Sequence, residues 1–246
     1  MKKILIFIIT ATLFYNCKTP DSLRSSDDDL RRISFHTTDL ISIAVPTIYE
    51  GNIKYLDTNK RKTWVDVDDV AHDNTLLHSL SDILSSVTVY KTNREGSLTL
   101  IGNSISAKDE TYKVIYDFSQ TQTIEGDSIK KSIGVAVRMI AEITTSKRGL
   151  DLTNLFKLSV DAEKENISGS LTVRSIGISS QKVNQSIPTT TDLSPASIAT
   201  ALQTVATIKS SIYDNETRIT PYLIGFSVHG NTKKQEVESI INNTSL

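Results

Sequence analysis

The chain has 246 residues, 27 basic and 28 acidic side chains, and a formal net charge of −1. This near-neutral balance, without a basic stripe, argues against nucleic acid as a partner. A single cysteine, Cys17, excludes a disulfide within the chain, so the core must hold by packing alone.

The N-terminal segment has the charge and hydrophobicity profile of a secretory signal. Lys2 and Lys3 precede an apolar run from Ile4 to Phe14, which is shorter than the roughly 20 residues that a spanning helix needs. Hydrophobicity stops at Cys17, where the polar sequence KTP follows. This arrangement resembles bacterial lipoprotein precursors, in which the cysteine that ends a lipobox receives a diacylglycerol and becomes the new N-terminus.

The resemblance implies that residues 1–17 are a lipoprotein signal peptide and that Cys17 carries the lipid. Asn16 and Phe14 stand where that family usually has a small and an aliphatic residue. The implied location is the bacterial cell envelope at the outer membrane, anchored by fatty acyl chains such as palmitate. Two alternatives stay open: an uncleaved anchor with an incidental cysteine, and cleavage elsewhere that releases a soluble protein.

Residues 18–32 mix Ser, Asp and Arg without apolar periodicity, which predicts a polar tether. The body, residues 33–230, begins with β patterns: Ile41, Ile43 and Val45 share one strand face, and two alternating runs in 52–69 predict a hairpin. Leucine and isoleucine at helical spacing then predict a short amphipathic helix over 73–86.

Strands resume in three segments. Residues 86–93 and 97–102 predict a second hairpin, and 111–119 places Tyr112, Val114, Tyr116 and Phe118 on one face. The longest predicted strand, 132–146, has a wholly apolar side made by its odd-numbered residues from Ile133 to Ile143. Its other side carries Arg138 and Glu142, which lie roughly 13 Å apart and therefore cannot pair with each other.

The C-terminal half predicts alternating helices and strands. We expect a helix over 151–166, a strand over 167–180 that is bulged or buried on both faces, and a long polar loop over 179–194 that offers a contact surface. Ser194 and Pro195 then predict a capped helix over 192–215. A strand over 218–230 and a polar tail over 231–246 complete the chain.

These patterns predict an α+β fold: an antiparallel, hairpin-rich sheet that continues into a C-terminal βαβαβ segment with helices on one face. A single domain is expected, with a split into two subdomains near 124–130 as the alternative.

No motif for a cofactor, a nucleophilic triad or a metalloprotease occurs, so we predict no catalytic residues and no cofactor. The densest group of possible metal ligands is Asp66, Asp68, Asp69, His72 and Asp73, which would suit calcium, or zinc with the imidazole. A solvated loop that caps the next helix explains the same residues. Arg138, Glu142 and Asp117 could line a cleft or belong to an ordinary exposed sheet face.

The leading functional hypothesis is a lipid-anchored, non-enzymatic envelope protein with a binding or structural role and an envelope protein as its partner. A hydrolase whose site is assembled from scattered residues, and a membrane-acting effector whose long Ser/Thr-rich strands rearrange, are the alternatives.

Overall fold

The computed structural model shows a unit made mostly of strands, with 56% of the described residues in strands and 22% in helices. All described residues belong to one compact unit. They are residues 40–57, 59, 61–70, 75–101, 110–126, 129–145, 151–156, 167–228 and 239.

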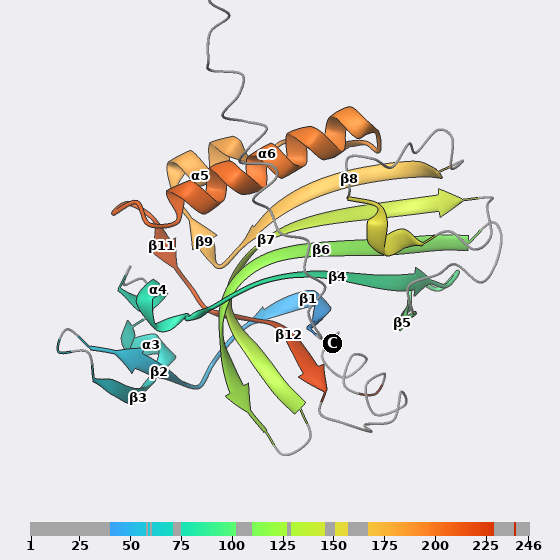
Figure 1. Ribbon diagram of the computed structural model, residues 1–246. Helices are drawn as coiled ribbons and strands as arrows, with labels where there is room; N and C mark the ends of the chain where they lie inside the picture. The colour runs from blue at the N-terminus through green and yellow to red at the C-terminus, as the bar shows by residue number, and fades with distance from the viewer. Residues whose placement is uncertain are drawn as a thin grey trace, which may run out of the picture. The chain divides into compact units, whose positions relative to one another are not determined.

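Twelve strands and a few helices make up this part of the chain (Figure 1). The strands are β1 Ile41–Ile48, β2 Asn52–Leu56, β3 Lys62–Asp66, β4 Asp82–Thr92, β5 Leu98–Leu100, β6 Glu110–Glu125, β7 Ile129–Thr145, β8 Ile167–Ile176, β9 Ile178–Ser179, β10 Thr191–Asp192, β11 Arg218–Ile219 and β12 Tyr222–Val228. The helices are α3 Val67–Val70, α4 Leu76–Ser79, the 3₁₀ turn η2 Leu152–Asn154, α5 Gln181–Ser186 and α6 Pro195–Ser211.

Eight strands form one sheet, in the order β1-β12-β7-β6-β4-β5, with β8 on β7 and β10 on β8. The long hairpin β6–β7 is its spine, because these two strands pair continuously from Glu110↔Thr145 to Glu125↔Lys130. A subdomain split was considered near residues 124–130; the described residues there pair across the closed end of this hairpin, Ile124 with Lys131 and Glu125 with Lys130.

The outer edge of β7 is shared by two strands. Its second half, from Ala136 to Thr145, pairs with β8, and its first half, from Ile129 to Gly134, pairs with β12. β12 therefore continues along β7 where β8 stops. Between them the chain makes an excursion through α5 and α6, which the short β9–β11 pair closes at its base.

The predicted α+β class with a βαβαβ segment is wrong. Every strand pairing in the described part of the chain is antiparallel. β8 and β12 do run in the same direction with helices between them, but both pair with β7 and not with each other, so no parallel pair forms. The predicted loop over 179–194 also contains α5 and β10.

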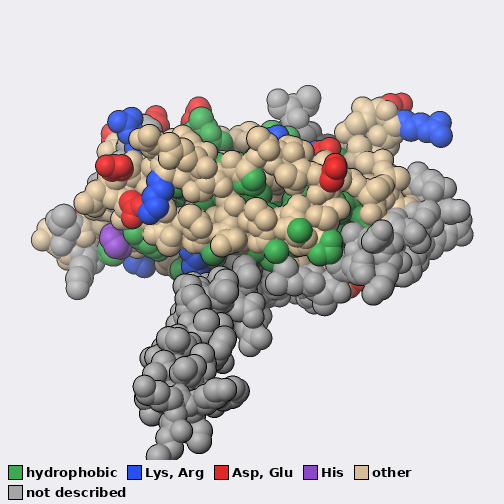
Figure 2. Space-filling model, turned by 90° about the horizontal axis from the view of Figure 1, so that it is seen from above, with side chains coloured by type: hydrophobic (Ala, Val, Ile, Leu, Met, Phe, Trp, Pro, Cys, Tyr) green, Lys and Arg blue, Asp and Glu red, His purple; other side chains and the backbone are tan. Residues whose placement is uncertain are grey.

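One face of the sheet, which we call the helical face, is covered by α6, which packs on β7 and β8. As predicted, the odd-numbered residues of β7 from Ile133 to Ile143 are buried. α6 begins as the sequence indicates, with Ser194 accepting a hydrogen bond from the Ser197 amide and Pro195 in its first turn. Seen from above, few charged side chains interrupt the centre of this helical layer (Figure 2).

The opposite face, which we call the β1 face, is covered by the chain's own first strand. The sheet curls so that β1 contacts β4 and β6 as well as its ladder partner β12. Ile43 of β1 packs there with Tyr90 and Ile115 in one buried cluster. Both faces of the β6–β7 hairpin are therefore buried over much of its length.

The helix predicted over 73–86 is mostly absent. Among its described residues, 75–86, only α4, Leu76–Ser79, is helical; the chain then enters β4 at Asp82, and Ile83 is exposed. β4 pairs with β6 along its whole length, and this pairing determines the structure there despite the helical spacing of the leucines. The start of the helix predicted over 151–166 forms the 3₁₀ turn η2, capped by Asp151, and residues 157–166 lie outside the described residues.

Both predicted hairpins are confirmed, as β2–β3 and β4–β5. β2 and α4 are attached to β6 by two buried glutamine side chains. The Gln122 amide accepts a hydrogen bond from the Lys54 amide nitrogen at 2.7 Å and donates to the Lys54 carbonyl at 2.8 Å, while Gln120 donates to the Leu77 and Leu80 carbonyls. No helix in the described part of the chain is long and apolar enough to cross a membrane.

Candidate functional site

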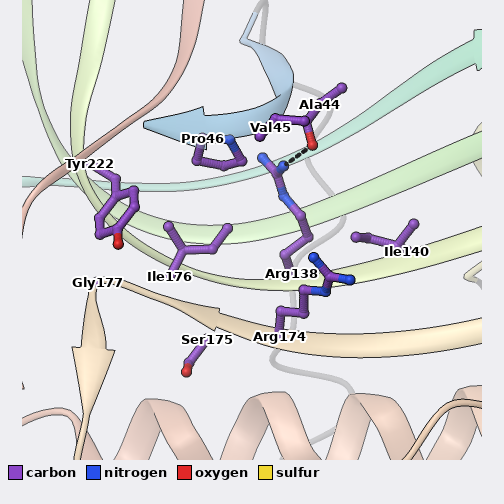
Figure 3. A pocket seen from close by; sticks show the side chains of 10 residues that line it. All are labelled: Ala44, Val45, Pro46, Arg138, Ile140, Arg174, Ser175, Ile176, Gly177 and Tyr222. Atoms are coloured by element: carbon purple, nitrogen blue, oxygen red, sulfur yellow. Dashed lines mark hydrogen bonds between the residues drawn. The ribbon is translucent and has the colours of Figure 1, made fainter. Parts of the chain in front are cut away.

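A pocket of about 240 Å³ opens on the β1 face, where β1, β7 and β8 meet the start of β12 (Figure 3). Its lining combines apolar side chains, two arginines and one tyrosine. The residues are Ala44, Val45, Pro46, Arg138, Ile140, Arg174, Ser175, Ile176, Gly177 and Tyr222.

β1 forms one wall of the pocket because it departs there from its hydrogen-bonded pairing with β12. Ser42 pairs with Gly225 and Thr47 with Leu223, so β1 advances five residues while β12 advances two. The extra residues form a bulge whose backbone groups need other partners. Pro46 lies in this bulge, where its missing N–H costs the ladder nothing.

Arg138 supplies those partners from the floor of the pocket. Its Nη1 donates to the Ile43 carbonyl at 2.6 Å and to the Ala44 carbonyl at 3.2 Å. The guanidinium is 1% exposed, yet it is charged, so its burial requires a countercharge.

Asp117 provides that countercharge from the adjacent strand. It lies directly opposite Arg138 in the β6–β7 register, and Nε and Nη2 of Arg138 each donate to one carboxylate oxygen at 2.7 Å. Such a two-pronged pair is strong and directional. We call the set of Asp117, Arg138 and the two β1 carbonyls the arginine clamp.

A second set of polar side chains holds β1 close to the pocket. The Ser42 amide donates to Thr88 Oγ1 at 2.9 Å, and the Ser42 and Ser86 hydroxyls share a hydrogen bond at 3.0 Å. Tyr90 donates to the Ser42 carbonyl. Burial raises the pKa of Tyr90 well above its ordinary value, so this phenol stays protonated and keeps donating.

Arg174 is the exposed charge of the pocket. It lies opposite Arg138 in the β7–β8 register, and its side chain extends beside that of Arg138 (Figure 3). Within the part of the chain that the structure describes, no hydrogen bond or ion pair occupies its guanidinium.

The remaining wall is apolar. Ile140 and Tyr222 border the pocket, and Ile176 continues into a buried cluster with Ala136 and Ile224. Gly177 ends β8 with a φ of +71°, and a Cβ there would lie 2.1 Å from the Thr220 carbonyl oxygen. Only glycine fits this turn without strain. Ser175 points away, towards α6 (Figure 3).

Of the three charged residues that the sequence suggested for a cleft, Arg138 lines the pocket and Asp117 holds it in place. Glu142 instead pairs with Lys113 at 3.1 Å. The prediction that Arg138 and Glu142 do not pair with each other is confirmed. Each instead pairs with a residue of the neighbouring strand β6: Arg138 with Asp117, and Glu142 with Lys113.

The sequence offered Asp66, Asp68, Asp69, His72 and Asp73 only as weak candidates for metal ligands. Among the residues that the structure describes, no group of three or more candidate ligands occurs. Asp66 and Asp68 are exposed, and Asp66 Oδ1 accepts a hydrogen bond from the Asp68 amide at the start of α3. Asp69 is exposed on the same helix. His72 and Asp73 lie outside the described residues, as do Cys17, the other predicted features of residues 1–32, and the predicted tail over 231–246 apart from Ser239.

Sequence reasoning missed Arg174 and the bulge of β1. The alternation of β8 does place Arg174 on the side opposite Val173, but nothing local shows which strand lies beside it.

Comparison with known proteins finds no relative. No protein-family model matches the chain, and no curated protein or solved structure matches it significantly. The pocket must therefore be interpreted from its own chemistry.

Proposed function

We propose that this chain is a lipid-anchored protein of the bacterial cell envelope whose folded unit binds a small ligand without transforming it. The observation that supports binding is the pocket beside β1, which combines apolar walls with a few polar groups. This composition is typical of small-molecule sites.

The groups that face the pocket favour binding over catalysis. Its charged side chains are two arginines, and a guanidinium offers hydrogen-bond donors but no acceptor for a substrate proton. The one carboxylate in contact with them, Asp117, is 0% exposed and already bonded through both oxygens to Arg138.

The anchoring part of the proposal depends on Cys17 and its resemblance to the lipoprotein lipobox. Each buried methylene of an acyl chain contributes about 0.8 kcal/mol, and two or more chains hold a protein stably on a membrane. Cells grown with labelled palmitate should incorporate the label into the wild-type protein and not into Cys17→Ala. A wild-type protein that carries no label and fractionates with the aqueous compartments would contradict the anchor.

The binding part is tested by recovering what the protein carries from its own cells. The wild-type protein, purified without denaturation, should release a specific small molecule that mass spectrometry detects. Ile140→Trp places a large side chain on the pocket wall and should abolish that recovery. Ile83→Trp, at an exposed position outside the pocket, is the matched control. Equal recovery from the wild-type protein and Ile140→Trp would contradict binding at this site.

A further inference from the structure

The charge balance of the pocket narrows the class of ligand. Arg138 is neutralised by Asp117, and four hydrogen bonds to Asp117 and β1 take up most of its N–H donors. It can hold the wall of the pocket in place but offers little to a ligand.

Arg174 is in the opposite situation. It lies beside Arg138 in the β7–β8 register, and Asp117 is already fully engaged on the other side. The nearest acidic side chain along β7, Glu142, is paired with Lys113. Among the described residues, the pocket therefore keeps one uncompensated positive charge, carried on a planar fork that matches a carboxylate.

The rest of the lining is suited to a short apolar body. Pro46, Ile176 and the ring of Tyr222 lie on one side of the two arginines, with Val45 above, and Ile140 lies on the other side (Figure 3). The volume of about 240 Å³ is below the roughly 300–1,000 Å³ typical of sites for drug-sized ligands, so the body must be small.

We infer that the pocket binds an amphipathic monocarboxylate, with the carboxylate on Arg174 and a short apolar tail against Ile176 and Tyr222. This inference rests on the proposed function, because it names the ligand class of the same site. The carboxylate can belong to a free organic acid or to the C-terminus of a peptide with an apolar last residue.

The probe is hexanoate, titrated into the mature protein by calorimetry or NMR, with hexanamide and hexylamine as neutral and cationic analogues of the same length. We expect hexanoate to bind at least tenfold more tightly than hexanamide, and hexylamine not to bind, because a charge-assisted hydrogen bond is lost or replaced by repulsion. Butyrate should bind more weakly than hexanoate because it buries fewer methylenes. Acetyl-leucine distinguishes the sources: tighter binding than hexanoate favours a peptide terminus, and weaker binding favours a free acid.

Variants of Arg174 test its role in binding the carboxylate. Arg174→Gln, at an exposed position, should weaken hexanoate at least tenfold while leaving hexanamide unchanged, and Arg174→Lys should lie between, because it keeps the charge but loses the fork. Arg94→Gln, in the β4–β5 turn, removes the same charge from an exposed residue outside the pocket and should change nothing.

Equal affinity for hexanoate and hexanamide, or an unchanged hexanoate affinity in Arg174→Gln, would overturn the inference. The proposed function has its own readout. If the native ligand is lost in Ile140→Trp while hexanoate fails to bind the wild-type protein, the pocket is a binding site and only the ligand class is wrong. If the native ligand is recovered equally from Ile140→Trp, both proposals fail.

Discussion

The two faces of the β6–β7 hairpin are both buried, but by opposite means. On the helical face, the odd-numbered residues of β7 from Ile133 to Ile143 pack as apolar side chains under α6 and the segment around Phe156. On the β1 face, burial depends on the arginine clamp and on the hydroxyl groups around Ser42.

The difference shows what each face can specify. Apolar packing has little directional preference. It therefore holds α6 on the sheet but does little to set the position of each atom. A buried guanidinium with fixed donors requires its partners at set positions, and those partners include two carbonyls of β1. The contacts on the β1 face thus fix the bulge of β1, which forms one wall of the pocket.

Breaking the clamp should have the largest effect. Asp117→Asn leaves the Arg138 guanidinium buried without its countercharge, so we expect the free energy of unfolding in urea to fall by about 3–5 kcal/mol. The double variant Asp117→Leu with Arg138→Met removes both charges and should recover much of that loss. A double variant whose loss equals the sum of the losses of Asp117→Leu alone and Arg138→Met alone would show that the charges do not act as a pair.

A cavity on the helical face should cost a similar or slightly smaller amount, without a polar contribution. Met139→Ala removes a fully buried side chain, and we expect a loss of about 2–5 kcal/mol in urea unfolding. Ile83→Ala, at an exposed position, should change stability by less than about 0.5 kcal/mol. If Met139→Ala altered hexanoate binding as strongly as Arg174→Gln, the two faces would not be independent.

Removing one of the hydroxyl groups around Ser42 should have a smaller effect on the free energy of unfolding, and this effect should depend on pH. Tyr90→Phe removes the donor to the Ser42 carbonyl and should cost about 1 kcal/mol at neutral pH. Because the pKa of Tyr90 is raised in the folded state, its share of the stability is complete below the ordinary tyrosine pKa of about 10 and is lost as pH rises through the folded-state value.

The wild-type protein should therefore lose stability more steeply above about pH 10 than Tyr90→Phe does. Tyr116, whose pKa burial raises to about 12, adds to the decline in both proteins. Urea unfolding at neutral and alkaline pH measures the two slopes, and identical slopes would count against a protonated, buried Tyr90.

The smallest effect is expected at Thr121, whose hydroxyl is buried and has no hydrogen-bond partner among the described residues. Thr121→Val should leave the free energy of unfolding unchanged or raise it by about 1 kcal/mol. Thr217→Val is the matched control, because the buried Thr217 hydroxyl donates to the Ser211 carbonyl at 2.8 Å and its removal should destabilise. Equal losses in both variants would indicate a partner for Thr121 beyond the described residues.

The same contrast explains how far sequence reasoning reached. The helical face was predictable because apolar residues alternate along β7 with period two, and α6 because Ser194 and Pro195 mark its start. The β1 face was not, since Arg138 and Asp117 look like exposed sheet residues until the strand that covers them is known.

Two errors have a shared physical cause. Leu76, Leu80 and Ile83 fit a helix locally, and the helices after β8 fit a parallel crossover locally, but pairing with distant strands decided both regions. The pocket is the extreme case, because its walls come from residues 44–46, 138 and 140, 174–177 and 222. No local pattern joins such segments.

The central claim is that the bulge of β1, held by the arginine clamp, completes a pocket that binds a small carboxylate. The most direct measurement is methyl NMR of isoleucine-labelled protein titrated with hexanoate. We predict saturable shifts of the Ile140 and Ile176 methyl signals, while the signal of Ile83, outside the pocket, stays in place. Shifts confined to isoleucines outside the pocket, or no shift at any of them, would contradict the account.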